Sequence, residues 1–226
     1  SIEGVNYLNG CSHEVIPDRI EAGTFFIAAA ATLSAITISP VIPSHLKSLL
    51  QKLQESGSKI IIKNNSISIK TEKIKAVNIE TAPFPGFPTD LQAPFTVLML
   101  KATGKSIIKE TIFENRMSHI ELLNKMGASI KLENNIATVS GVQKLSGRNL
   151  KGSDLRSTAA IVIAALAAEN TSLVEGLEHL DRGYENLEFK LKLLGANIQR
   201  DLTENFSKIS PQDNYFINDV EKLYAA

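Results

Sequence analysis

The sequence predicts an α/β domain turned inside out, in which buried helices form the core and β-sheets form the outer wall. Two kinds of marker indicate that the domain is built from three copies of one β-α-β-α-β-β unit. Three aspartates each precede an apolar segment, and three glycines each follow a leucine by four residues: Asp18, Asp90 and Asp154, and Gly57, Gly127 and Gly195. Both sets recur at intervals of about 70 residues, and two independent markers with one period indicate a repeated unit.

The first helix of each unit is expected to begin at its aspartate and to be buried. A short carboxylate at the N-cap accepts hydrogen bonds from backbone N–H groups that have no partner inside the helix. The segment Phe25–Leu33 is almost entirely apolar, and Ala159–Ala168 is apolar on every side. Because a helix that is apolar all round has to be buried, we predict three core helices, capped by Asp18, Asp90 and Asp154.

The second helix of each unit is expected to lie at the surface. Three amphipathic segments carry lysines and glutamates on one face: Ser44–Glu55, Ser118–Met126 and Tyr184–Leu194. Each is followed by one of the repeated glycines, and glycine is the usual residue just beyond a helix C-terminus.

Short strands complete each unit. Two predicted hairpins turn at Asn-Asn pairs, since asparagine tolerates positive φ: Lys59–Lys63 with Ser66–Lys70, and Ser129–Glu133 with Ala137–Ser140. Opening strands are expected at Glu14–Pro17, at Ala76–Thr81 and just before Asp154. The repeat then stops at Asp201, and residues 201–226 are expected to form a loose polar tail, with one short helix near Asn218–Tyr224.

Composition excludes several classes of protein. With 226 residues and 43% hydrophobic content, the chain can bury one sizeable core. The 24 basic and 24 acidic side chains cancel, so no general field attracts nucleic acid or an anionic membrane. The longest apolar runs, about ten residues, are too short to span a bilayer. No signal peptide is visible in the sequence, and the single Cys11 excludes an internal disulfide, so we expect a cytoplasmic protein.

Three arginines stand near predicted helix starts: Arg116 in FENRMSH, Arg156 in SDLRST and Arg182 in LDRGYEN. An arginine near a helix N-terminus opposes the helix dipole, so this placement does not serve helix stability. It suits a site for carboxylate or phosphate, where guanidinium groups and backbone N–H groups act together. The alternative is three ordinary surface ion pairs, with Glu114, Asp154 and Asp181 as neighbours.

Asp90 is preceded by a stiff loop, PFPGFPTD, with three prolines around Gly86. Such a loop is a reasonable way to aim a carboxylate at a substrate hydroxyl as a general base. The other interpretation is a plain N-cap after a tight turn. A helix N-terminus also lowers the pKa of a carboxylate, which weakens it as a base. The residues alone leave both roles open.

Five segments together resemble the C-terminal half of the UDP-N-acetylglucosamine enolpyruvyl transferases: VIPDRIEAGTF, TAPFPGFPTDLQAPF, ETIFENRMSHIELLNKMGA, GSDLRSTAA and HLDRGYENLEFKLKLLGANI. They span residues 1–200 in the family's order. The resemblance implies an inside-out α/β barrel domain over 1–200, with repeats at about 14–70, 76–141 and 148–200, followed by the tail at 201–226.

The resemblance implies transfer of enolpyruvyl from phosphoenolpyruvate to the 3′-hydroxyl of UDP-N-acetylglucosamine, with release of phosphate. This is the first committed step of peptidoglycan synthesis and needs no cofactor or metal ion. Two alternatives stay open. One is 3-phosphoshikimate enolpyruvyl transferase, which shares the fold but typically has lysine where Arg182 stands. The other is a non-catalytic half-domain that binds nucleotide-sugar.

The family's site residues carry over to matching positions of this chain. Asp90 matches the aspartate that binds the sugar 3′-hydroxyl and is proposed as its general base. Arg116 and Arg182 match arginines that face the charged groups of phosphoenolpyruvate, and Asp154 with Arg156 matches an acidic–basic pair of the same cleft. Ile112 matches a position that touches the nucleotide-sugar. Asp18 aligns with another aspartate beside the cleft, although a cap is an equally good role for it.

The family has two such domains, and the chain resembles one of them. The N-terminal domain, with a Lys-Asn pair and a mobile loop that carries a cysteine or aspartate acid, has no counterpart here. Cys11 is not that acid, because it lies just before the first unit. We therefore expect the chain to be a fragment whose partner is the missing N-terminal domain, and expect the fragment alone to be inactive.

Overall fold

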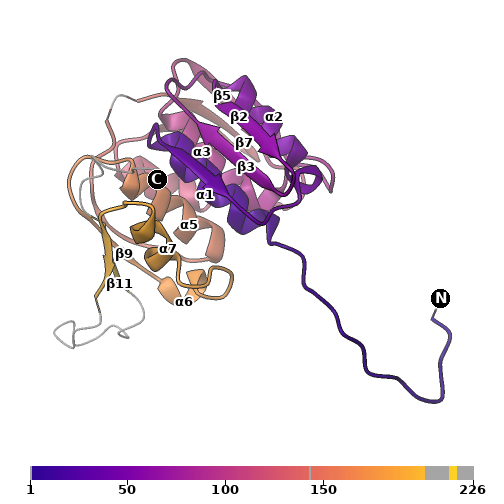
Figure 1. Cartoon of the computed structure of the whole chain (residues 1–226). Coiled ribbons are helices and arrows are strands. Elements are labelled where there is room, and N and C mark those ends of the chain that lie inside the picture. The colour runs from indigo at the N-terminus through magenta and orange to yellow at the C-terminus, as the bar shows by residue number, and fades with distance from the viewer. Residues whose placement is uncertain (1, 143, 202–213, 218–226) are drawn as a thin grey trace.

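The structure is a computed structural model that describes residues 2–142, 144–201 and 214–217. Three helices lie at the centre and contact one another, α1 (Arg19–Ala31), α3 (Gln92–Leu100) and α5 (Leu155–Leu166). Every residue of α3 is buried, as are Gly23–Ala31 of α1 and Ser157–Leu166 of α5. Figure 1 shows the sheets outside these helices. The predicted core of apolar helices is confirmed.

The described residues form three sheets, and two of these are assembled from neighbouring segments of the chain. The first has the order β1-β3-β2, with β1 (Ala35–Ile38), β3 (Ser66–Lys70) and β2 (Lys59–Lys63) all antiparallel. The second has the order β4-β5-β7-β6, with β4 (Ile79–Glu80), β5 (Lys105–Lys109), β7 (Ile136–Ser140) and β6 (Ser129–Glu133). Here β4 runs parallel to β5. Both predicted hairpins are confirmed, and their turns place Asn64 and Asn134 at positive φ.

The third sheet corrects the expectation of a loose polar tail at Asn214–Ile217. Its order is β8-β9-β11-β10, with β8 (Asn149–Lys151), β9 (Ser172–Glu175), β11 (Asn214–Ile217) and β10 (Ile198–Arg200). The strand β11 comes from the polar tail and pairs antiparallel with both β9 and β10. It takes the position that β3 and β7 hold in the other sheets, because the gap between two strands offers backbone partners to any extended segment. The expected helix near Asn218–Tyr224 lies outside the described residues.

The second helices cover the outside. They are η1 (Pro43–Leu46) leading into α2 (Lys47–Glu55), α4 (His119–Lys125), and the pair α6 (Leu177–Leu180) and α7 (Leu187–Leu193), while η2 (Thr89–Leu91) leads into α3. In the third unit the predicted start at Tyr184 is wrong. The buried Tyr184 forms a hydrogen bond through its hydroxyl to Thr24 of α1 at 2.8 Å, and Asn186 adopts positive φ before α7 begins.

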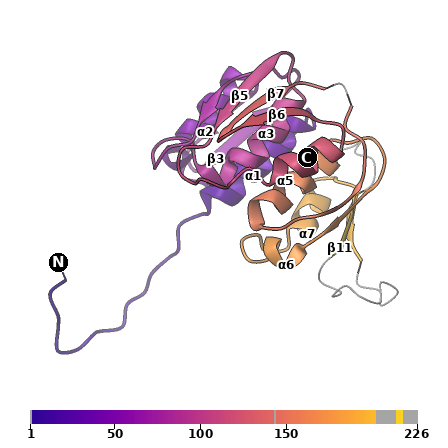
Figure 2. The ribbon, with the colours of Figure 1, turned by 180° about the vertical axis from the view of Figure 1, so that it is seen from behind.

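The first unit lacks its opening strand. Residues 2–17 run away from the domain as an extended arm, as both views show (Figure 1 and Figure 2). The predicted strand Glu14–Pro17 is therefore wrong, and β1 lies at the edge of a sheet one strand smaller than its two relatives. A hollow of about 790 Å³ beside this edge is lined by Val15, Phe25, Ile38 and Leu193, among others. The arm forms no ladder with β1, so ladder hydrogen bonds do not offset the conformational entropy that it would lose on docking.

Among the residues that the structure describes, no helix has the length and apolar character that crossing a bilayer requires.

Candidate functional site

Asp90 does not cap its helix, which corrects one of the two interpretations of this residue. It lies in the middle of the short 3₁₀ turn η2, and α3 begins only at Gln92, with Leu91 in the N-cap position. No side chain caps α3 or η2. The extended backbone at Pro88 and the 3₁₀ turn that follows account for the difference, because they insert one additional turn between the loop and the helix. The Asp90 carboxylate is thereby released from the helix backbone.

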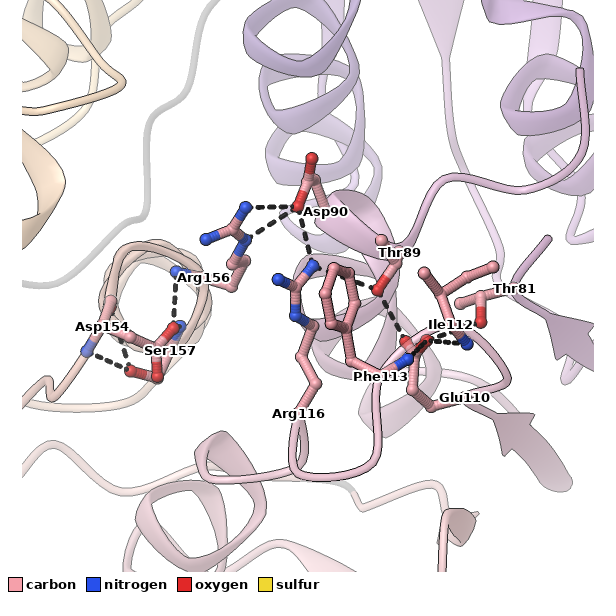
Figure 3. A network of polar contacts seen from close by, with 10 residues as sticks. All are labelled: Thr81, Thr89, Asp90, Glu110, Ile112, Phe113, Arg116, Asp154, Arg156 and Ser157. Carbon is pink, nitrogen blue, oxygen red and sulfur yellow. Dashed lines mark hydrogen bonds and ion pairs between the residues drawn. The ribbon is translucent and has the colours of Figure 1, made fainter. Parts of the chain in front are cut away.

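Two arginines from distant parts of the chain hold Asp90 instead, and we call these three residues the Asp90 cluster (Figure 3). Arg116 donates from Nη1 to Oδ1 of Asp90 at 3.0 Å. Arg156 donates to the same oxygen from Nε at 2.7 Å, with Nη2 also 2.7 Å away. Charge-assisted contacts of this length are among the stronger polar interactions in proteins.

All of these contacts use one oxygen of the carboxylate. Within the part of the chain that the structure describes, Oδ2 of Asp90 has no polar contact, and Figure 3 shows it pointing away from both guanidinium groups. The side chain is 35% exposed, so this oxygen is within reach of a ligand. One oxygen of Asp90 is anchored and the other is available.

Arg116 is held from three sides. Its Nη1 also lies 3.3 Å from the Thr89 hydroxyl oxygen, and its guanidinium carbon lies 3.6 Å from the centre of the Phe113 ring. Burial lowers the pKa of Arg116, and repulsion from Arg156 lowers it further, while Asp90 acts in the opposite direction. An arginine stays protonated at neutral pH despite such effects, so the cluster carries two positive charges around one carboxylate.

Glu110, which sequence reasoning missed, lies beneath the cluster with 2% of its surface exposed. Its carboxylate accepts hydrogen bonds from the hydroxyls of Thr81 and Thr89 and from the backbone N–H groups of Ile112 and Phe113. The available signal was its place at the start of the segment ETIFENRMSHIELLNKMGA, six residues before Arg116.

Asp154 is a helix cap, as expected from its spacing. Its Oδ1 accepts from the backbone N–H groups of Arg156 at 2.9 Å and Ser157 at 3.0 Å. Its Oδ2 accepts from the Ser118 hydroxyl at 2.9 Å. Burial raises the pKa of Asp154, but the hydrogen bonds from Ser157 and Ser118 together outweigh it and hold that pKa below its usual value. This carboxylate is therefore ionised, and both of its oxygens are occupied.

The neighbouring His119, the first residue of α4, adds no charge to the site. It is fully buried, and burial lowers its pKa to about 4, against the attraction of Asp154. Its imidazole is neutral at pH 7. The positive charge near Asp90 comes from the arginines.

Arg182 lies outside the Asp90 cluster. It occupies the turn between α6 and α7 rather than a helix start, its side chain is exposed, and it makes no polar contact within the described part of the chain. The surface pairs considered as an alternative do not form there either: Asp181 pairs with Arg200 at 2.7 Å. Ile112 has an exposed side chain, and its backbone N–H donates a hydrogen bond to the Glu110 carboxylate.

The geometry permits acid–base and anion chemistry. A carboxylate with one unoccupied oxygen can accept a proton from a bound hydroxyl. The guanidinium groups retain N–H donors that can bind a carboxylate or phosphate. No group of three or more His, Cys, Asp or Glu side chains suited to a metal ion occurs in the described residues.

Residues 1–212 of the chain match the family described as EPSP synthase (3-phosphoshikimate 1-carboxyvinyltransferase). The chain is 65% identical over 230 residues to the UDP-N-acetylglucosamine 1-carboxyvinyltransferase of Prochlorococcus marinus (strain MIT 9312), an alignment that covers 100% of this chain and 50% of that protein. It is 68% identical over 204 residues to the protein of the same name from strain AS9601, covering 90% of this chain and 45% of the relative. The chain spans about half the length of the curated relatives it matches.

Solved structures share the fold. The enolpyruvyl transferase NikO from Streptomyces tendae matches 80% of this chain and 43% of its own, with a TM-score of 0.73 and 26% identity. EPSP synthase from Acinetobacter baumannii matches 94% of this chain and 48% of its own, with a TM-score of 0.67 and 16% identity. The predicted inside-out α/β class is confirmed.

Proposed function

Because the chain belongs to the EPSP synthase (3-phosphoshikimate 1-carboxyvinyltransferase) family, we propose that it is one domain of an enolpyruvyl transferase. The whole protein transfers enolpyruvyl from phosphoenolpyruvate to the 3′-hydroxyl of UDP-N-acetylglucosamine and releases phosphate. High identity to relatives that carry the UDP-N-acetylglucosamine name supports this acceptor. The reaction is the committed entry to peptidoglycan synthesis, and we place it in the cytoplasm.

The observation that carries the proposal is the asymmetry of Asp90, whose Oδ1 is held by two arginines while Oδ2 is open. In the first half of the reaction Oδ2 accepts the proton of the sugar hydroxyl, whose oxygen forms a bond to C2 of phosphoenolpyruvate. An acid from the other domain protonates the methylene carbon. This gives a tetrahedral intermediate that still carries its phosphate.

In the second half the phosphate leaves C2, a proton leaves the new methyl group, and the enolpyruvyl ether remains. Negative charge is present throughout on the phosphate and on the carboxylate of the three-carbon unit. Arg116 and Arg156 supply fixed donors near the reacting centre, which is where preorganised charge lowers a barrier most. Arginine also binds carboxylate and phosphate through paired N–H groups.

The remaining assignments extend the same proposal. Arg182 reaches the phosphoenolpyruvate anion once the second domain and substrates are in place, and Ile112 contacts the nucleotide-sugar with its exposed side chain. Asp154 holds the start of α5, which carries Arg156, through its cap. Residues 1–200 form the domain that meets the partner domain, which supplies the acid.

The test is a phosphate-release assay on the protein completed with its other domain. Phosphoenolpyruvate with UDP-N-acetylglucosamine should support turnover, whereas phosphoenolpyruvate with 3-phosphoshikimate should not. This chain alone, with either acceptor, should release no phosphate because it lacks the acid. Turnover with 3-phosphoshikimate, or turnover by the isolated chain close to that of the completed enzyme, would overturn the assignment.

A further inference from the structure

Glu110 is a buried carboxylate that joins three separate parts of the domain. It follows β5 directly and contacts Thr81 beyond β4, Thr89 in η2, and the loop that begins at Ile112. A buried carboxylate is unfavourable unless hydrogen bonds compensate it, and here four donors point at its two oxygens. We propose that Glu110 is a positioning residue that orients Arg116 on Asp90, a role that rests on the proposed function.

The first route to Arg116 runs through the Thr89 hydroxyl. Thr89 donates to Oε2 of Glu110 at 2.8 Å, which fixes the direction of its single hydrogen. The lone pairs of the same oxygen then face Nη1 of Arg116 at 3.3 Å. The carboxylate thus determines that Thr89 acts as an acceptor toward the guanidinium group (Figure 3). Thr89 directly precedes Asp90 within η2. Arg116 therefore contacts this turn twice, through the Thr89 hydroxyl and through the Asp90 carboxylate.

The second route runs through the loop backbone. Oε1 of Glu110 accepts from Ile112 N–H at 2.8 Å and from Phe113 N–H at 3.2 Å. These bonds fix the position from which the Phe113 ring reaches the guanidinium group of Arg116, at 3.6 Å. The Thr81 hydroxyl donates to the same oxygen at 2.9 Å and ties the loop to the sheet. Glu110 therefore controls the hydrogen-bond partner and the stacking partner of Arg116 together.

The test uses Glu110→Gln in the completed enzyme. The glutamine has nearly the same shape, and its amide oxygen is expected to stay with the three donors around Oε1. Its NH₂ group would then face Thr89, whose hydroxyl would accept that bond and turn its hydrogen toward Arg116. We expect kcat/KM for phosphoenolpyruvate to fall by about tenfold, the effect of one hydrogen bond to a charged group. The thermal unfolding midpoint should change little.

Four further variants identify the route. Thr89→Val removes the hydroxyl relay but leaves the loop bonds of Glu110, so it should reproduce most of the loss, and Thr89→Ser should restore it. The double variant Glu110→Gln with Thr89→Val should lose much less than the product of the two single losses, because both changes break one path. Glu114→Gln, at an exposed position of the same loop, removes a charge without touching the network and should behave as wild type.

Amide hydrogen exchange of Ile112 and Phe113 adds a readout that needs no turnover. Their protection should persist in Thr89→Val and in Glu110→Gln, and should be lost in Glu110→Ala. Normal kinetics in Glu110→Gln, strictly multiplicative losses in the double variant, or a loss explained by a lower unfolding midpoint would overturn the positioning role. A completed wild-type enzyme without turnover would instead overturn the proposed function, while unprotected amides in wild type would overturn the network itself.

Discussion

The start of α3 and the start of α5 carry the same sequence marker and use it in opposite ways. Oδ1 of Asp154 accepts hydrogen bonds from backbone N–H groups of α5, and Oδ2 accepts one from the Ser118 hydroxyl. Asp90 stands one 3₁₀ turn ahead of α3 and gives its Oδ1 to two arginines, leaving Oδ2 open. A repeated residue thus supports the fold in one unit and is available for chemistry in another.

The first unit shows which of the two is the default. Asp18 accepts from the N–H groups of Ile20 and Glu21, at 2.7 and 3.2 Å, and caps α1 as Asp154 caps α5. Two of the three aspartates therefore do what local chemistry favours. The third differs because a proline-rich loop inserts a turn, and because Arg156 from α5 reaches across to it. Differences between equivalent positions of a repeat point to function more clearly than the repeat itself.

The largest expected effect is on Asp90. In the completed enzyme Asp90→Asn should lower kcat by at least about 10²-fold, the usual scale of a positioned general base. The free energy of unfolding should change by no more than about 1 kcal/mol, since partly exposed ion pairs contribute little. Asp154→Asn is the matched control, because asparagine still caps a helix, and its kcat should fall by less. Equal losses in the two variants would remove the distinction between the helix starts.

The next largest effect is expected for the arginines and concerns phosphoenolpyruvate binding. Replacing Arg116, Arg156 or Arg182 with alanine should weaken phosphoenolpyruvate binding in the completed enzyme by about 1.5–3 kcal/mol, the range for hydrogen bonds to charged groups. If the three share one anion, as proposed, their losses should not add in double variants. Isothermal titration of each variant measures this. Additive losses, or losses confined to thermal stability, would show that the three arginines do not bind one anion together.

Removal of the Asp154 cap should lower the free energy of unfolding. Asp154→Ala should lower the free energy of unfolding by about 1–2 kcal/mol, and Asp154→Asn should recover most of it.

The stability that Asp154 contributes should also depend on pH, because the folded-state pKa of Asp154 is below its usual value. The ionised carboxylate therefore adds stability above the unfolded pKa, and this part is lost as the pH falls through the folded value. Urea titrations should show wild type and Asp154→Asn converging below about pH 4. A difference that grows in acid would contradict the assignment.

The smallest effect belongs to Asp18. Its cap is exposed, so Asp18→Ala should cost about 0.5–1 kcal/mol of unfolding free energy, toward the lower part of the range for N-caps. Asp18→Asn should leave stability and turnover close to wild type. A large loss of turnover in Asp18→Asn, with stability intact, would show that the first helix start also takes part in catalysis.

Features that depend on local burial and turn chemistry were predictable from the sequence. The all-apolar segments gave the core helices, and the Asn-Asn pairs gave the hairpin turns, because period and turn residues act within a few positions. Features that depend on distant partners were not. The strand β11 forms because β9 and β10 supply its hydrogen-bond partners. The segment Glu14–Pro17 has the composition of a strand but pairs with no strand of the described sheets.

The candidate site divides in the same way. Asp90, Arg116 and Arg156 stood out by type and spacing, whereas their meeting at one oxygen depends on tertiary packing, such as that of α5 against α3. Arg182 lies in the turn between α6 and α7, and the nearby Tyr184 is tied to Thr24 of α1 by a long-range hydrogen bond that spacing alone does not predict. Glu110 was missed because its place before the FENR phrase is a weak signal, and a single glutamate resembles any surface glutamate until its burial is known.

The most direct test is a crystal structure of the completed enzyme with UDP-N-acetylglucosamine bound. The 3′-hydroxyl oxygen should lie within about 3.2 Å of Oδ2 of Asp90, the range of a true hydrogen bond, while Arg116 and Arg156 remain on Oδ1. An Asp90 carboxylate turned onto the backbone N–H groups of α3, or a sugar hydroxyl bound by other residues, would contradict the division of roles between the two helix starts.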